Sequence, residues 1–394
     1  MLLPLEQFRL RNLKSIRDSG EIEFSPLTVF IGGNGSGKSS LIEGLETIYE
    51  LTESDVDQVF SQPRWRSFDN VWNKAVDHNE GKRTLESGLR LRENPMAFDL
   101  RTHSDGAGFR YRGEITRASG GESGILISEE SIVRGGRSTI AKRDETGHVS
   151  QPAADVKKPF KYRLDAGESL LATGMFPDIH RWQFLRLEPG NMGQPSARRQ
   201  TIGASKLLPD GSNLADYLTN ILMKDTTAFN RLVESLLLIL DYGRDFKVET
   251  LSKLDERVYF KLNEGDFEIP GWMLSTGSVR LVAILACLYH PEPPPVLFIE
   301  ELENGLDPRT LGYVVEQIRQ VVQSGATQVV ATTHSPHFLN LLTLDHLVLV
   351  KRDTDGSPRF WRPKTSDQLQ KWAKKFAPGQ LYERGTIIQQ FPEA

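Results

Sequence analysis

The feature that most constrains this chain is a glycine-rich loop at residues 32–39, which reads GGNGSGKS. It follows a wholly apolar run at residues 27–31, which is typical of a strand buried in a parallel sheet. After the loop, apolar residues recur at helical spacing as far as residue 51. Glycines let backbone N–H groups turn towards phosphate oxygens, and the start of the helix offers its positive end to the same anion. The sequence therefore predicts a strand, a loop and a helix that hold the phosphates of a nucleotide.

The loop matches the pattern G-x-x-x-x-G-K-[ST] at every required position. Lys38 is expected to reach the β and γ phosphates, and the hydroxyl of Ser39 is expected to ligate Mg²⁺. The predicted cofactors are therefore ATP and Mg²⁺. The residues predicted to surround the nucleotide phosphates are Gly32, Asn34, Gly35, Ser36, Gly37, Lys38, Ser39 and Ser40.

Two carboxylates follow a second apolar run. Residues 296–299 predict a short buried strand, and Glu300 and Glu301 come directly after it. Ligands bind at the C-terminal ends of strands in open α/β sheets, so both carboxylates are expected beside the phosphates. We expect Glu300 to hold Mg²⁺ through water, although aspartate is the usual residue there. We expect Glu301 to orient or deprotonate the attacking water.

Two further segments carry polar residues at element boundaries. Ser275 and Gly277 begin an apolar helix expected over residues 275–289, and His334 follows a strand expected over residues 328–332. Taken alone, Ser275 would be a helix cap, because serine satisfies the free N–H groups at a helix start. A single histidine such as His334 is, taken alone, usually structural. Both residues gain meaning from their order along the chain after the glycine-rich loop.

The arrangement of these segments predicts an α/β protein. Helices alternate with strands over residues 271–350, which is typical of a parallel sheet covered on both faces. Residues 50–175 contain alternating polar and apolar stretches with recurrent turn signals, which favours an antiparallel meander. We expect four parts, in chain order the N-terminal part of a nucleotide-binding head, an inserted β-rich lobe, the C-terminal part of the head and a tail: residues 1–50, 51–205, 206–355 and 356–394.

In this order the four motifs resemble the ABC-type ATPase head of the SMC, RecF and OLD superfamily. Residues 32–39 correspond to Walker A, residues 274–277 to the L-S-x-G signature, and residues 296–301 to Walker B. Residues 210–214 resemble a stretch common in the predicted ATPases of the AAA_21 group, which includes many components of bacterial anti-phage systems. Residues 8–16 resemble the family's first strand and turn, near the nucleotide base. The resemblance implies a P-loop NTPase of ABC type with a helical segment that carries the signature.

The resemblance also implies how the motifs work. Ser275 and Gly277 of one subunit would close over the γ-phosphate bound by another, so ATP would clamp two heads into a dimer. Asp307 would belong to the D-loop, and His334 would contact the γ-phosphate or the attacking water. The implied catalytic residues are Lys38, Glu301 and His334.

Spacing separates this chain from several members of that superfamily. Ser275 lies 236 positions after Ser39 with no sustained heptad pattern, which excludes a long coiled-coil arm. The same long insert is unlike an ABC transporter ATPase, in which the signature lies much closer to Walker A. Only 60 residues follow His334, too few for the nuclease domain of OLD proteins, so we expect a nuclease-like effector to be a separate polypeptide. The Q-loop has no clear match, and Gln183 is the candidate.

The amino-acid composition limits the kinds of partner that this protein is expected to bind. The chain has 48 Lys and Arg against 52 Asp and Glu, a net charge of −4, which excludes a chain-wide basic surface for nucleic acid. Local basic clusters at residues 157–161 and 196–200 could still follow a phosphate backbone. The single cysteine, Cys287, excludes a Cys-based zinc site. We find neither a bilayer-spanning run nor a signal peptide, so we expect a cytoplasmic protein without a membrane partner.

We therefore expect a Mg²⁺-dependent ATPase that dimerises head to head and hydrolyses ATP slowly through Glu301. Its expected role is the sensor or switch subunit of a bacterial anti-phage defence system, working with a separately encoded effector. Two alternatives stay open: a RecF-like DNA-repair clamp that binds duplex DNA directly, and a scaffold that binds ATP to assemble an oligomer with negligible turnover. Stimulation by DNA would favour the clamp, and assembly that survives loss of Glu301 would favour the scaffold.

Overall fold

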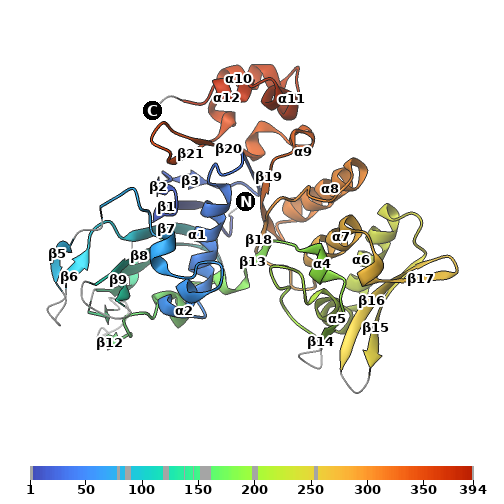
Figure 1. Cartoon of the computed structure of the whole chain (residues 1–394), viewed down its shortest axis with the longest axis horizontal. Helices are drawn as coiled ribbons and strands as arrows, with labels where there is room; N and C mark the ends of the chain where they lie inside the picture. Colours follow the sequence, from blue (N-terminus) through green and yellow to red (C-terminus); the bar gives the residue numbers. More distant parts are fainter. Residues whose placement is uncertain are drawn as a thin grey trace.

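The protein is built in layers around a central sheet that separates two hydrophobic cores (Figure 1). Helix α1 and a large antiparallel sheet cover one face of the central sheet, and helices from the second half of the chain cover the other. No helix in the part of the chain that is described is long and apolar enough to span a membrane. The computed structural model describes residues 3–77, 80–84, 90–118, 124–136, 138–144, 146–150, 161–197, 203–252 and 256–392.

The central sheet has the strand order β13-β18-β19-β4-β20-β21. Neighbouring strands from β13 to β20 are parallel, and β21 runs antiparallel to β20. Every residue of β4 is buried, because this strand has a core on each face. The predicted α/β fold with a parallel sheet is therefore confirmed. The strands are β4 (Leu27–Ile31), β13 (Gln183–Leu185), β18 (Val296–Ile299), β19 (Gln328–Thr333), β20 (Leu347–Arg352) and β21 (Pro358–Trp361).

The second sheet is antiparallel and has the order β12-β11-β10-β9-β8-β7-β1-β2, with β3 also paired to β1. Strand β1 pairs with β7, so hydrogen bonds cross the expected division at residue 50. The expected division at residue 205 is crossed too, because β13 belongs to the central sheet. The strands are β1 (Gln7–Leu13), β2 (Ile16–Asp18), β3 (Ile22–Glu23), β7 (Met96–Ser104), β8 (Ala107–Arg117), β9 (Ile125–Arg134), β10 (Ser138–Arg143), β11 (His148–Ser150) and β12 (Lys161–Arg163), beside a hairpin of β5 (Glu80–Thr84) and β6 (Arg90–Arg92).

Helix α1 (Lys38–Glu50) lies between the two sheets and positions the glycine-rich loop. Its residue Leu41 is buried in the same core as Leu10 of β1 and Phe30 of β4. A side chain at Gly44 would place its Cβ 2.6 Å from the Leu10 side chain, so α1 packs closely on β1. Because the loop joins the end of β4 to the start of α1, it lies at the C-terminal edge of the central sheet.

The opposite face of the central sheet is covered mainly by α7, with its neighbours beside it (Figure 1). Residues 278–288 of α7 are all buried, and its apolar residues surround the helix axis, as suits a helix inside a core. The helices on this side are α4 (Pro189–Met192), α5 (Leu214–Lys224), α6 (Thr226–Ile239), α7 (Thr276–Leu288), α8 (Pro308–Ser324) and α9 (Pro336–Asn340). A smaller sheet packs against them and contains β14 (Ser196–Ala197), β15 (Asp245–Ser252), β16 (Arg257–Glu264) and β17 (Phe267–Pro270).

The C-terminal residues pack against the central sheet. Strand β21 extends that sheet, and Leu369, Leu381 and Ile387 are buried in the helical core. The three helices that follow lie together at the top of Figure 1: α10 (Asp367–Ala373), α11 (Pro378–Glu383) and α12 (Thr386–Gln389). The remaining short helices are α2 (Val56–Ser61), α3 (Phe68–Val71), η1 (Leu170–Thr173), η2 (Ile179–Arg181), η3 (Gly271–Met273), η4 (Leu344–His346) and η5 (Pro363–Thr365).

Candidate active site

A cavity of about 490 Å³ lies at the C-terminal edge of the central sheet, where β4, β18 and β19 end. It brings together residues that are far apart in the sequence, because parallel strands end at the same edge. Its lining contains most of the predicted phosphate loop and all three of the predicted catalytic side chains. The lining residues are Lys14, Ser15, Asn34, Gly35, Ser36, Gly37, Lys38, Ser39, Ser40, Glu301, His334 and Arg352.

The loop itself is packed so closely that glycine is required at two positions. A Cβ at Gly32 would lie 2.2 Å from the carbonyl oxygen of Val350, and one at Gly37 would lie 2.4 Å from Pro358. Gly37 also has a φ of +110°, a conformation that favours glycine. The hydroxyl of Ser36 is buried and has no hydrogen-bond partner within the described residues. The loop is thus a closely packed cradle with a polar atom left for a ligand.

The Lys38 side chain folds back over this loop. Its Nζ donates to the carbonyl oxygens of Gly32 at 2.8 Å and Gly33 at 3.1 Å. Burial lowers the pKa of Lys38 to about 8, although the Glu301, Glu303 and Glu300 carboxylates favour the charged form. An ammonium group that has lost water and gained only carbonyl acceptors is stabilised by an incoming anion. The residues of the loop therefore fit a phosphate ligand.

Glu301 lies across the cavity in a strained backbone conformation. Its φ is +48°, which is rare for a residue with a side chain. Two neighbouring elements hold it there: its N–H donates to Oγ1 of Thr332 at 3.0 Å, and its carbonyl oxygen accepts from Nη2 of Arg280 at 2.8 Å. Its carboxylate accepts a longer bond from Asn304 at 3.4 Å. In this conformation the side chain of Glu301 lines the cavity.

His334 follows β19 and also lines the cavity. Its backbone N–H donates to Oε1 of Glu303 at 2.9 Å, so a third carboxylate after β18 fixes the start of this turn. Burial lowers the pKa of His334, and the positive charge of Lys38 lowers it further. The imidazole is therefore neutral at pH 7 and able to accept or donate a hydrogen bond without adding charge.

The two predicted metal-binding side chains lie in different surroundings. Ser39 lines the cavity, whereas Oε1 of Glu300 accepts a bond of 2.6 Å from Nε of Arg186, the residue directly after β13. Within the described residues, no group of three or more His, Cys, Asp and Glu side chains could hold a metal alone. A hydroxyl and one carboxylate nevertheless fit Mg²⁺, which is commonly held by few protein groups together with nucleotide phosphates and water.

The signature and D-loop residues do not line this cavity. The hydroxyl of Ser275 accepts the N–H of Ser278 at 3.1 Å and caps α7, while Ser275 itself is exposed. A Cβ at Gly277 would lie 2.3 Å from the carbonyl oxygen of Gly305, so the signature packs directly on the D-loop. Asp307 caps α8 by accepting the N–H groups of Arg309 and Thr310. Ser275, Gly277 and Asp307 are therefore absent from the lining of the cavity in their own chain.

Three residues that the motifs did not indicate belong to the site. Nε of Arg352 donates to the carbonyl oxygen of Gly35 at 2.7 Å, which brings a guanidinium to the rim of the cavity. Arg186 reaches Glu300, and Glu303 orients the turn at His334. None of the three lies at a required motif position. The available signal for Arg186 and Arg352 was their place directly after, or at the end of, a strand, whereas Glu303 lies four residues after β18.

The Q-loop candidate Gln183 does not lie in the cavity. It pairs with Leu297 inside the sheet, before the edge where the phosphates are expected. Its Nε2 donates to the carbonyl oxygens of Phe184 at 3.1 Å and Leu207 at 2.7 Å, so the amide is used within the core. The basic clusters of the sequence lie mainly outside the described residues, at 157–160 and 198–200.

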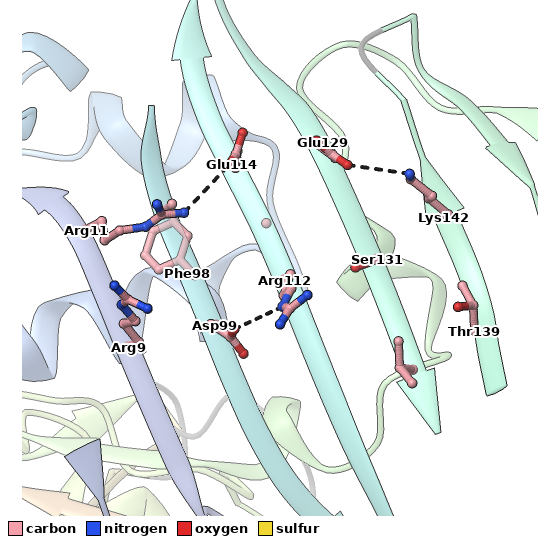
Figure 2. Close-up of a pocket in the computed structure, with 13 residues that line it drawn as sticks. Arg9, Arg11, Phe98, Asp99, Arg112, Glu114, Glu129, Ser131, Thr139 and Lys142 are labelled. Atoms are coloured by element: carbon pink, nitrogen blue, oxygen red, sulfur yellow. Dashed lines mark hydrogen bonds and ion pairs between the residues drawn. The ribbon is translucent and has the colours of Figure 1, made fainter. Parts of the chain in front are cut away.

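A separate cavity of about 550 Å³ lies on the outer face of the antiparallel sheet. Figure 2 shows that its charged side chains come from neighbouring strands and face one another. Arg112 lies 3.0 Å from Asp99, and Lys142 lies 3.6 Å from Glu129, while Arg11 also has a carboxylate partner. This face therefore carries largely balanced charge.

Known proteins resemble parts of this chain. A family model described as "AAA domain, putative AbiEii toxin, Type IV TA system" (AAA_21) matches residues 27–340. The ABC transporter G family member STR2 of Medicago truncatula is 32% identical over 126 residues, which are 29% of this chain and 17% of that protein. A putative ABC transporter ATP-binding protein of Caldanaerobacter subterraneus is 28% identical over 139 residues, 34% of this chain and 56% of that protein. The alignments thus span only part of both relatives.

A solved structure supports the fold over nearly the whole chain. The crystal structure of an Smc head bound to the C-winged helix domain of ScpA has a TM-score of 0.51 and 15% identity. The match covers 91% of this chain and 96% of that chain. At this level of identity, the similarity concerns the fold.

Proposed function

This chain belongs to the AAA_21 family and is an ATPase with an SMC- and ABC-like P-loop fold, and from this premise we propose that two copies bind Mg·ATP between them and hydrolyse it through Glu301. The observation that carries the proposal is the convergence of Lys38, Glu301 and His334 on one cavity. A cation can stabilise the charge that develops in phosphoryl transfer, and a carboxylate and a neutral imidazole can orient and deprotonate the attacking water.

Each side chain has a distinct part in this reaction. Lys38 places its ammonium group on the phosphate oxygens where negative charge increases. Glu301 accepts a proton from the attacking water, and His334 holds that water or a γ-phosphate oxygen by a hydrogen bond. Bound Mg²⁺, held by Ser39 and Glu300, would neutralise charge on the β and γ phosphates. The backbone bonds to Thr332 and Arg280 hold the Glu301 backbone in position before the nucleotide arrives.

The position of the signature supports a site shared between two copies. Ser275 lies at the exposed N-terminus of a 13-residue helix, where free N–H groups attract an anion, yet it does not line the cavity of its own chain. Large apolar side chains beside it are exposed, including Trp272 at 41% and Met273 at 70%. Such residues are commonly covered in an interface. A second copy facing the first would cover them and bring Ser275 to the partner's γ-phosphate.

We further propose that ATP binding and hydrolysis switch a bacterial anti-phage defence system in which a separately encoded protein is the effector. The family description includes a toxin of a toxin–antitoxin system. The Smc head to which this fold is similar is bound to a winged-helix domain, so an ATPase head of this shape can bind a protein partner. A partner that recognises the ATP-bound pair would couple nucleotide state to output.

Mixing two inactive variants tests the shared site. Lys38→Ala removes nucleotide binding but keeps the signature, and Ser275→Arg blocks the signature but keeps the phosphate loop. Each variant alone is expected to be inactive, and an equimolar mixture is expected to recover ATP hydrolysis, because one complete shared site forms in the mixed pair. Lys38→Ala mixed with Glu301→Gln is the control, since the only site of that pair that can bind ATP lacks the general base. A mixture of Lys38→Ala with Ser275→Arg that stays inactive, beside an active wild-type chain, would contradict the proposal.

Measuring ATP hydrolysis with and without linear duplex DNA distinguishes the proposed function from its two alternatives, the RecF-like DNA-repair clamp and the ATP-dependent scaffold. Stimulation by DNA that is lost in Glu301→Gln would favour the RecF-like clamp, in which case binding should weaken steeply with salt. Hydrolysis indifferent to DNA would favour the sensor with a protein partner. ATP-dependent assembly without hydrolysis, equal in the wild-type chain and Glu301→Gln, would favour the scaffold.

A further inference from the structure

The central sheet places an arginine against the predicted metal-binding carboxylate. Leu185 of β13 pairs with Ile299 of β18, and the N–H of Glu300 donates to the carbonyl oxygen of Leu185 at 2.9 Å. The residues that follow the two strands, Arg186 and Glu300, therefore leave the sheet side by side. Nε of Arg186 donates to Oε1 of Glu300 at 2.6 Å.

The same guanidinium also holds the helix that begins with the phosphate loop. Nη2 of Arg186 donates to Oε2 of Glu46, two turns into α1, and that carboxylate is only 4% exposed. Arg64 donates to the same oxygen of Glu46 and, at 2.6 Å, to Glu50. Arg186 thus links the end of β18 to the helix that positions Lys38 and Ser39.

The electrostatics fit a permanently charged link. A guanidinium is not deprotonated in proteins, so Arg186 is a permanently charged partner for both Glu46 and Glu300. The bond to Arg186 engages Oε1 of Glu300, so Oε2 is the oxygen available to a metal-bound water. Groups that hold a metal-binding carboxylate in this way tune both its orientation and its basicity.

We propose that Arg186 is the positioning residue of the metal site: it orients Glu300 for Mg²⁺ and links that carboxylate to α1. The phosphate loop and the metal site are thereby held at a fixed position relative to each other. This inference rests on the proposed Mg·ATP binding. Arg186 need not touch the nucleotide. Its loss should weaken the metal and leave metal-free nucleotide binding intact.

The test measures metal affinity directly, with Mn²⁺ as the probe. Mn²⁺ binding to the full chain saturated with the non-hydrolysable analogue AMP-PNP is followed by electron paramagnetic resonance, and AMP-PNP binding in EDTA is measured separately. Arg186→Gln is expected to weaken Mn²⁺ about 10- to 100-fold, the usual effect of removing a group that supports a metal ligand. AMP-PNP affinity in EDTA should stay within about twofold.

Matched variants distinguish a loss of Glu300 positioning from a general disturbance of the fold. Arg64→Gln removes the other cation on Glu46 and should leave Mn²⁺ affinity at the wild-type value. Glu300→Gln should lower it as Arg186→Gln does, and the double variant should lose no more than either single variant, because both act through one carboxylate. Arg186→Lys keeps the positive charge but cannot donate to both Glu300 and Glu46 in the geometry of a guanidinium. Its Mn²⁺ affinity should therefore lie between those of Arg186→Gln and the wild-type chain.

The outcomes distinguish this inference from the proposed function. If the wild-type chain does not bind AMP-PNP, the proposed function fails. If it binds AMP-PNP and Mn²⁺ normally, and Arg186→Gln keeps wild-type Mn²⁺ affinity while Glu300→Gln loses it, only the role of Arg186 is overturned. If Arg186→Gln does not fold, Arg186→Lys and the additivity of Arg186→Lys with Glu300→Gln decide the question, and full additivity would overturn the proposal.

Discussion

Two charged surfaces of this protein, the active-site edge of the central sheet and the outer face of the antiparallel sheet, differ in how their cations are neutralised. On the outer face, Arg112 and Lys142 each lie beside a carboxylate (Figure 2). At the active-site edge, the buried ammonium group of Lys38 donates to two carbonyl oxygens and, among the residues that the structure describes, forms no ion pair. A buried cation without an ion-pair partner is set up to bind an anion, whereas a paired exposed cation contributes little.

The largest effect is expected from Lys38→Ala. The substitution removes the only side-chain cation of the phosphate loop, so nucleotide binding should be abolished, as measured by equilibrium binding of a fluorescent ATP analogue. Lys142→Ala on the outer face is the matched control and should bind the analogue as the wild-type chain does. Equal loss in both variants would remove the distinction between the two surfaces.

The next largest effect is expected from Glu301→Gln. Loss of a general base typically costs about 100- to 10,000-fold in rate, while the amide keeps the shape of the side chain. ATP binding should persist, and ATP should hold the variant as a dimer, detectable by light scattering during gel filtration. Normal hydrolysis by this variant would show that another group activates the water.

A large effect on stability is expected from Glu130→Ala, on the inner side of the antiparallel sheet. Glu130 is fully buried and accepts hydrogen bonds from Tyr111, Ser169 and Arg143, which is itself 1% exposed. Breaking a buried pair costs about 3–5 kcal/mol, and the lower end is expected because Arg143 keeps carbonyl acceptors. Urea unfolding measures the loss. Glu129→Ala, the exposed neighbour, should change stability by less than about 0.5 kcal/mol.

A smaller effect on nucleotide binding is expected when the pH is raised. The pKa of Lys38 is lowered to about 8 by burial, and a phosphate binds its protonated form. Binding therefore raises this pKa, so affinity is full below pH 8 and falls as pH rises through 8, by about tenfold between pH 7 and pH 9. Titration of ATP-analogue binding at fixed ionic strength measures it. Lys38→Arg, which stays charged, should bind with a flat profile if it binds at all.

The smallest effect is expected from Arg112→Ala. Its side chain is exposed and paired with Asp99, which keeps a second partner in Arg110. Exposed pairs of this kind contribute about 0–1 kcal/mol, so both stability and ATP binding should change little. A large loss of DNA-stimulated hydrolysis in this variant would instead give the outer face a role in binding nucleic acid.

The sequence by itself determined the parts of the site that are contiguous in the chain. The phosphate loop, the carboxylate Glu301 and the turn at His334 each follow an apolar run short enough to be a buried strand, and such strands end at one edge of a parallel sheet. The long α7 was equally clear, because its apolar run is too long for a strand and begins at a serine that can cap a helix. These features depend on local pattern alone.

Only the tertiary structure decided which strands are neighbours. Nothing local distinguishes Gln183, which points into the core, from Arg186 three residues later, which meets Glu300 and Glu46. The pairing of β1 with β7 and the reach of Arg352 to Gly35 are decided in the same way. The physical reason is that hydrophobic periodicity specifies which face of an element is buried, whereas the partner that buries it is chosen by packing of the whole chain.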